Sequence, residues 1–200
     1  MKVEVRNGAA NIEGYVNVTE RLSKPIRDVR GNFLEKVAQG AFNSALQRNN
    51  NVELRFNHRK NLGDQKDGSL ELREDSIGLY AKATVTDAEV VELAEKRQLK
   101  GWSFGFKKLE DEWEKQENMP EIRTLKEIEL SEVSILSVNP AYIATSISVR
   151  SDAEEDLLEC RSNESAIGKL EYDIEKRSKS DDKKETSNEK YHDILNKMKA

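Results

Sequence analysis

The sequence predicts a mainly β protein with a few helices, an α+β fold. Apolar and polar residues alternate in several short runs, which is the period-two pattern of half-buried strands. Two further stretches carry apolar residues at helical spacing. After about residue 150 the composition turns strongly polar. We therefore expect one folded domain over residues 1–150, followed by a tail over residues 151–200.

The strands follow from the alternation, taken in chain order. Val3 and Val5 are separated by a charged residue, and residues 52–56, Val-Glu-Leu-Arg-Phe, alternate cleanly between apolar and polar. At least six short strands are expected from these and the other runs. The other runs are residues 15–18, 70–72, 79–85, 102–109, 122–137 and 147–149.

Two helices are expected to interrupt the strands. In residues 86–99 three apolar side chains share one helix face, and Thr86, followed three residues later by Glu89, matches a capping box. A helix is therefore expected to begin at that threonine. Residues 41–48 are a shorter candidate, introduced by a glycine and ended by three consecutive asparagines.

The tail over residues 151–200 is dominated by Ser, Asp, Glu, Lys and Asn. Such a segment cannot bury enough apolar area to offset its chain entropy, so we expect it to be disordered or weakly helical. A short amphipathic turn that docks on a partner is the alternative to a solvated linker. The apolar residues that would form it are Leu157, Leu158, Ile167 and Leu170.

Composition argues against several classes of partner. The net charge is −5 with both signs interspersed, so neither nucleic acid nor a membrane surface is an expected partner. Cys160 is the only cysteine, which excludes an intramolecular disulfide and a cysteine-rich metal site and favours a reducing compartment. We expect no membrane span or export signal, because no apolar run approaches the roughly 20 residues that cross a bilayer.

The segment around Ser103 carries the most chemical information. On a strand, Gly101, Ser103 and Gly105 share one face, while the aromatic residues between and after them share the other. Glycine in a strand often marks a close approach by a ligand or another backbone, which suits a nucleophile that must admit a peptide. The alternative is a structural serine between two glycines that packing requires.

The same residues, Gly-Trp-Ser-Phe-Gly, also match the nucleophile elbow of α/β-hydrolases. In that fold the serine opens a helix, and an acid and then a histidine follow it in the chain. Here the serine is followed by a strand-like run, and the only later histidine, His192, lies in the predicted tail. The chain also lacks the helical crossovers of a doubly wound sheet, so the elbow interpretation is not favoured.

His58 is the only histidine in the predicted domain. A serine hydroxyl needs a neighbouring base to accept its proton, and imidazole has the side-chain pKa closest to neutral pH. His58 is therefore the candidate base for Ser103. A structural or simply exposed histidine at the end of a strand is the alternative.

Glu132 is the candidate third member, which would orient the imidazole. Strand parity places it on one face with Leu130 and Leu136, in surroundings where a carboxylate needs a partner. A strand-edge acid paired with an Arg or Lys is the alternative interpretation. If Glu132 does not serve, Asp75 and Asp64 are the next candidates.

Taken in order, these pieces resemble the phage prohead (capsid maturation) serine protease family over residues 10 to 150. The pieces are Gly14-Tyr15, Phe33-Leu34-Glu35, Gly40-Ala41-Phe42, Phe56-Asn57-His58, Leu62-Gly63, Gly78-Leu79, residues 99–106 with Ser-Phe-Gly-Phe, residues 130–134, and Asn139-Pro140-Ala141-Tyr142.

The resemblance implies a fold similar to herpesvirus assemblin, a closed β-barrel ringed by short helices. It implies an endopeptidase that cuts scaffold and major capsid protein segments, and often itself, inside the assembling prohead in the host cytoplasm. The triad carried over is His58, Ser103 and, as the acidic or histidine third member, Glu132. No metal or cofactor is implied, and a homodimer is left open. A non-catalytic scaffold or capsid-assembly protein that keeps the fold is the alternative function.

Overall fold

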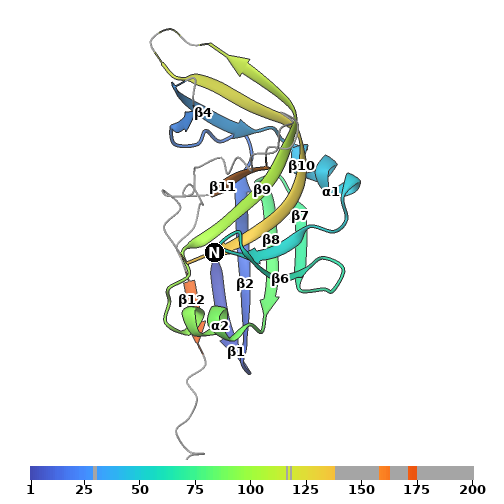
Figure 1. Ribbon diagram of the computed structural model, residues 1–200, viewed down its shortest axis with the longest axis vertical. Helices are drawn as coiled ribbons and strands as arrows, with labels where there is room; N and C mark the ends of the chain where they lie inside the picture. The colour runs from blue at the N-terminus through green and yellow to red at the C-terminus, as the bar shows by residue number, and fades with distance from the viewer. Residues whose placement is uncertain (29–30, 116, 118, 138–157, 163–170, 175–200) are drawn as a thin grey trace, which may run out of the picture.

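The computed structural model describes residues 1–28, 31–115, 117, 119–137, 158–162 and 171–174. These residues form two β-sheets and two short helices (Figure 1). The predicted mainly β, α+β class is confirmed. Among the described residues there is no helix long and apolar enough to cross a membrane.

The first sheet has five strands and is antiparallel except at one edge, where its outermost strand runs parallel to its neighbour. In spatial order the strands are β12 (Glu171–Ile174), β1 (Lys2–Arg6), β2 (Ala9–Val18), β8 (Gly78–Val85) and β7 (Leu70–Glu74).

The second sheet has seven strands and is built on a long antiparallel hairpin, β9 with β10. In Figure 1 this hairpin runs from about the middle of the view to its upper end. The main path of the sheet is β11 (Leu158–Ser162), β9 (Gly101–Glu114), β10 (Glu121–Leu136), β4 (Gly31–Val37) and β3 (Ile26–Asp28). A side branch contains β5 (Glu53–Phe56) and β6 (Lys60–Asp64).

The expected closed barrel is wrong for the described residues, because no strand of one sheet pairs with a strand of the other. The physical reason lies in β10. Residues 121–125 of this strand pair with β4, whereas residues 132–135 pair with β5 on the same edge. The sheet therefore branches there, whereas closure would need each strand to continue one ring of neighbours.

Both helices form, and one begins later than predicted. Helix α1 (Ala41–Arg48) follows Gly40 and ends at Asn49, as expected. Helix α2 (Ala88–Glu95) is capped by Asp87, whose side chain accepts a hydrogen bond from the Val90 amide at 3.3 Å. The capping box predicted at Thr86 is therefore wrong. The aspartate one residue later takes that role because its carboxylate reaches an otherwise unpaired amide.

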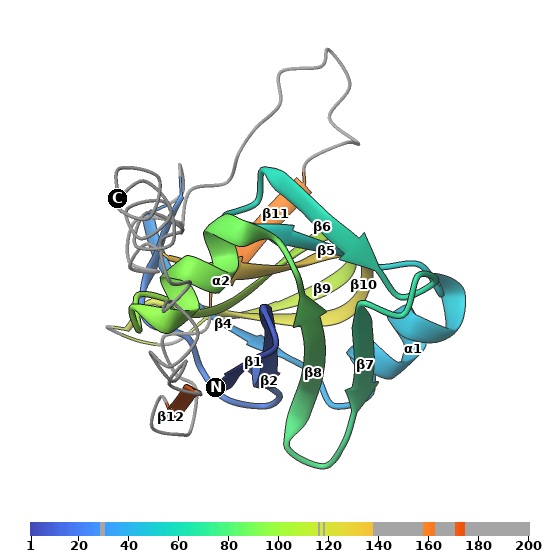
Figure 2. The same ribbon diagram turned by 90° about the horizontal axis from the view of Figure 1, so that it is seen from below.

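The core lies between the two sheets, with side chains from both helices added to it. In Figure 2 the strands β1, β2, β7 and β8 lie on one side of the molecule and β5, β6, β9 and β10 on the other. Trp102, Phe104 and Phe106 from β9 are among the largest fully buried side chains. Phe104 packs against Phe42 of α1 at 5.3 Å between ring centroids, edge to face. The aromatic face of the Ser103 strand is thus part of the core.

Most predicted strands are present, but several strands were not predicted. The buried face of β4 consists of Phe33, Glu35 and Val37. β4 was missed because the charged residue in the middle of this face interrupts the apolar–polar alternation expected of a strand. β3, β6, β11 and β12 were also not foreseen. The expected strand at residues 147–149 lies outside the described residues.

The division at residue 150 remains a prediction, and most of the predicted tail lies outside the described residues. Two short segments beyond the division, β11 and β12, are strands of the two sheets. The structure therefore adds two docked strands to a segment for which only polarity was apparent.

Candidate active site

A tight turn between β5 and β6 positions His58. The Arg59 amide donates to the Phe56 carbonyl at 3.0 Å, and the two residues between them, Asn57 and His58, both have positive φ, 50° and 62°. Two positive φ values are the signature of a type I′ hairpin turn, where Asn is favoured. The Asn57 side chain also makes two hydrogen bonds to Ser137. It donates to the Ser137 hydroxyl at 2.9 Å and accepts from the Ser137 amide at 3.0 Å. These bonds fix the turn against the end of β10.

Strand β9 supplies Ser103 on the face opposite its aromatic residues. Ser103 is directly opposite Ser134 of β10, and the next residue on this face, Gly105, is opposite Glu132. Ser103 and Glu132 therefore share one polar face of the hairpin, behind which the aromatic face is packed. This is the alternation that the sequence predicted for the glycines and the serine.

A β-bulge corrects the predicted surroundings of Glu132. The pairing shifts by one residue between Leu130, which is opposite Phe106, and Glu132, which is opposite Gly105. Leu130 therefore joins the aromatic core face and does not share a face with Glu132, as strand parity had predicted. Leu136, beyond the shift, does share the face of Glu132. A bulge re-aims the side chains that follow it, and here it turns a carboxylate toward the polar face.

Glu132 contacts both His58 and an arginine. Its Oε1 is 2.5 Å from His58 Nδ1, and its Oε2 lies 3.0 Å from Arg55 Nε. The side chains of His58 and Glu132 are only 5% and 3% exposed. A carboxylate on Nδ1 fixes the imidazole so that Nε2 is the nitrogen available for proton transfer. His58 Nε2 is buried and has no hydrogen-bond partner among the described residues.

The pKa of His58 is raised from its ordinary value of 6.5 to about 9. Burial alone would lower this pKa, but interactions with Cys160 and Glu132 favour the charged imidazolium and outweigh it. In the arrangement described, His58 is therefore protonated at neutral pH.

Ser103 is fully buried, and its hydroxyl donates to the main-chain carbonyl of Arg161 at 2.7 Å. Arg161 belongs to β11, which pairs antiparallel with β9 along the stretch that contains the serine. The hydroxyl proton is thus directed at this strand and not at His58. The three predicted residues come from three neighbouring strands or their ends, and β11 is a fourth element at the same place.

Cys160 of β11 was not foreseen at this site. It is buried opposite Gly105, and its sulfur and the ligand atoms of His58 and Glu132 all lie within 4.8 Å of one another. A zinc ion would hold two ligand atoms about 3.3 Å apart in tetrahedral geometry. The 2.5 Å separation between His58 Nδ1 and Glu132 Oε1 leaves no room for an ion between them. We interpret the group as a hydrogen-bonded cluster.

One signal could have located β11. Residues 158–161, Leu-Glu-Cys-Arg, alternate apolar and charged within the polar tail. The run is too short to stand out from the surrounding polar composition without knowledge of the edge that it pairs with.

The reserve candidates have other roles in the described structure. Asp75 accepts from the Tyr15 hydroxyl and the Ile77 amide, both at 2.8 Å, and closes the turn before β8. Asp64 accepts from the Lys66 and Asp67 amides. The Gly63 amide, whose N–H could otherwise serve as an oxyanion donor, is bonded to Asn61 Oδ1 at 2.8 Å. Each of these groups is bonded within its own turn, and Asp75 is also bonded to Tyr15 of β2.

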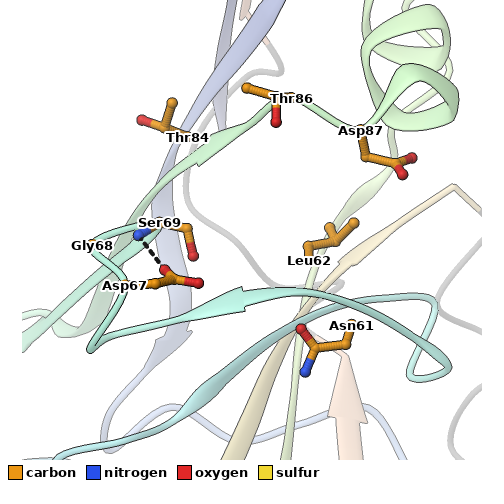
Figure 3. A pocket seen from close by; sticks show the side chains of 8 residues that line it. All are labelled: Asn61, Leu62, Asp67, Gly68, Ser69, Thr84, Thr86 and Asp87. Atoms are coloured by element: carbon orange, nitrogen blue, oxygen red, sulfur yellow. Dashed lines mark hydrogen bonds between the residues drawn. The ribbon is translucent and has the colours of Figure 1, made fainter.

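A pocket of about 610 Å³ lies beside the start of α2. Figure 3 shows Asp67 and Asp87 at its wall and the bond from the Ser69 amide to Asp67, 2.7 Å long. Asp87 caps α2 and forms an ion pair with Lys60 at 2.8 Å. The acids of this pocket thus serve turns and a helix end, and Ser103, His58 and Glu132 do not line it.

Comparison with known proteins identifies a family. A family model described as Caudovirus prohead serine protease matches residues 1–159. No curated protein and no solved structure matches the chain. The match extends past the predicted domain end at residue 150 and reaches β11.

Proposed function

This chain belongs to the caudovirus prohead serine protease family, and we propose that it is an endopeptidase with Ser103 as nucleophile, His58 as base and Glu132 as the acid that orients the base. Its substrates are scaffold and major capsid protein segments inside the assembling prohead. The observation that carries the assignment is the 2.5 Å contact between His58 Nδ1 and the buried Glu132 carboxylate, next to the strand that bears Ser103.

The chemistry is acyl transfer. Ser103 Oγ attacks the scissile carbonyl carbon while His58 Nε2 takes the hydroxyl proton, and Glu132 stabilises the imidazolium that forms. The imidazolium then gives its proton to the leaving amine. Water attacks the acyl-enzyme with His58 again as base, which releases the carboxylate product and restores the serine. Acylation and deacylation each begin with a neutral His58, so the protonated arrangement with β11 in place is a resting state.

We also propose that the protein trims its own chain between about Asp152 and Lys190. The tail is tethered to the enzyme, so its effective concentration at the site can reach about millimolar. The contact between Ser103 Oγ and the Arg161 carbonyl supports this, because it puts a peptide group of the tail at the nucleophile.

The test is incubation of the purified chain with its cognate scaffold segment, followed by mass spectrometry of both partners. We expect the wild-type chain and a Ser44→Ala control on α1 to cut the segment and to lose C-terminal mass with time. Ser103→Ala should do neither. Equal trimming of Ser103→Ala would point to a contaminating host protease.

The alternative, a non-catalytic assembly protein, is favoured by one observation, the complete burial of the Ser103 hydroxyl against β11. The same incubation decides between the two functions. An intact scaffold segment, with wild-type chain that is folded by circular dichroism, would favour the assembly role.

A further inference from the structure

Strand β11 lies where a peptide substrate would have to bind. It adds to the free side of β9, antiparallel, with Arg161 opposite Phe104 and Ser162 opposite Ser103. Addition of a strand to a sheet edge is a common way to bind an extended peptide, since main-chain hydrogen bonds give affinity and side-chain pockets give specificity. The position of β11 therefore indicates how a substrate strand lies on the enzyme.

The nucleophile contacts the main chain of this strand. Ser103 Oγ is 2.7 Å from the Arg161 carbonyl oxygen. A C=O bond is about 1.2 Å long, so the carbonyl carbon is no more than about 4 Å from the hydroxyl oxygen. Arg161 thus stands at the place of the residue whose carbonyl a serine protease attacks.

The side chains of Glu159 and Arg161 are held by two opposite charges of the folded domain. Both carboxylate oxygens of Glu159 accept from Arg123, at 2.7 and 2.9 Å. Arg161 donates from Nε to Glu35 Oε1 at 2.7 Å and from Nη2 to Oε2 at 3.2 Å. Both pairs are two-pronged contacts, which fix geometry as well as charge.

The two receiving charges are buried with β11 in place and are also bonded to groups of the domain outside β11. Glu35 is 4% exposed and Arg123 6%. They bond to each other at 3.0 Å, and Arg123 also bonds to Asp111 at 2.8 Å. Because both side chains are held by the domain itself, an incoming strand meets one negative and one positive charge in fixed positions. A peptide with the two charges in reverse order would bring carboxylate against Glu35 and guanidinium against Arg123.

We propose that Glu35 and Arg123 are specificity-determining residues that select substrate strands with an acidic residue and, two positions later, a basic residue at the scissile carbonyl, and that β11 is the internal occupant of this groove. The proposal deepens, and rests on, the proposed protease function. It names the substrate class as an acidic-x-basic peptide. It also explains why Ser103 is covered in the arrangement described.

The test uses full-length chains that carry Ser103→Ala, so that nothing is cut. In the first chain, Glu159→Lys and Arg161→Glu put like charges against Arg123 and Glu35 and displace β11. In the control chain, Glu71→Lys and Lys82→Glu exchange an exposed ion pair on the other sheet and leave β11 unchanged. Both chains keep the wild-type net charge.

The probes are two fluorescent nine-residue peptides. One has the sequence of residues 156–164, Asp-Leu-Leu-Glu-Cys-Arg-Ser-Asn-Glu, and the other has the central Glu and Arg exchanged. Fluorescence anisotropy should show the first peptide binding the displaced chain about tenfold or more tightly than the exchanged peptide. The control chain, whose own β11 fills the groove, should bind both weakly. Adding Glu35→Gln to the displaced chain should bring the two affinities toward equality.

Equal binding of both peptides by a folded displaced chain would overturn the proposal. If that chain does not fold by circular dichroism, the milder Glu159→Gln with Arg161→Gln gives the same comparison. Binding is measured without catalysis, so its failure leaves hydrolysis by the Ser103 chain untouched. Failure of the protease function would instead appear as an uncut scaffold segment.

Discussion

The two faces of the β9–β10 hairpin are built from alternate residues of the same strands, yet they do opposite things. One face packs Trp102, Phe104 and Phe106 into the core. The other presents Ser103, Glu132 and Ser134, equally buried but polar. The core face is held mainly by apolar packing, and of its three aromatic side chains only Trp102 carries a polar atom, an Nε1 without a hydrogen-bond partner among the described residues. On the polar face, His58 Nε2 and the Ser134 hydroxyl have no hydrogen-bond partner among the described residues. A buried polar group without a partner costs stability, and such groups concentrate at functional sites.

The largest effect should come from breaking the polar face at its proposed nucleophile and base. Ser103→Ala and His58→Ala should each lower kcat/KM by roughly 10⁴-fold or more, and the double variant should be little worse than either, because the two groups act as a unit. Steady-state hydrolysis of a scaffold peptide measures this. Additive losses would contradict the pairing.

The matching break on the core face should act on stability. Phe104→Ala removes a fully buried ring that contacts Phe42 and Phe106. We expect the free energy of unfolding to fall by about 3–5 kcal/mol, measured by urea denaturation. In chain that remains folded, the measured kcat should stay much closer to wild type than in Ser103→Ala. A loss of unfolding free energy below about 1 kcal/mol would show that the core face is not tightly packed around Phe104.

Glu132→Gln sharpens the comparison, because it alters charge on the polar face with little change of shape. Turnover should fall on the order of hundreds-fold or more, since the amide cannot stabilise the imidazolium. The free energy of unfolding should change by no more than about 2 kcal/mol. Full activity would require a different third member.

A pair of glycines on the polar face gives a smaller, purely steric test. A Cβ at Gly105 would lie 2.7 Å from Glu132 Cγ, whereas one at Gly101 would meet nothing within 4 Å. Gly105→Ala should therefore push the carboxylate away from His58 and lower kcat by about tenfold or more, whereas Gly101→Ala should be close to wild type. Equal effects of the two changes would mean that the position of Glu132 does not depend on the missing side chain at Gly105.

The last test concerns pH. Because the pKa of His58 is raised, the stabilising contribution of its protonated form is complete below pH 6.5 and is lost as pH rises through about 9. His58 must be neutral to act as the proposed base, so kcat/KM should rise between pH 7 and about 9. Within the described part of the chain, the titratable groups that face the ring are Cys160 on β11 and Glu132 on β10, and Glu132 is itself paired with Arg55 on β5. Cys160→Ala should move the midpoint to lower pH. An unchanged midpoint would show that the thiol does not affect the base.

Local pattern predicted much of this molecule, and long-range pairing accounts for what it missed. The helix at residues 41–48 and the two faces of β9 follow from spacing within a few residues. The surroundings of Glu132 were mispredicted in one respect, because a bulge shifts parity and leaves no mark in a run such as Leu130–Leu136. β4 and β11 were missed because the charges that alternate along them, Glu35, Glu159 and Arg161, are paired with each other or with Arg123 across the fold. Sequence alone shows such residues only as polar.

The two docked strands beyond residue 150 have a joint consequence for solubility. β11 covers the backbone edge of β9, and β12 covers that of β1, so one C-terminal segment protects both sheets. An unpaired edge presents a row of N–H and C=O groups that can pair with another chain. Loss of everything from residue 158 onward would therefore expose two such edges at once. A trimmed molecule would be prone to self-association, and the protein would be most soluble before it has been cut.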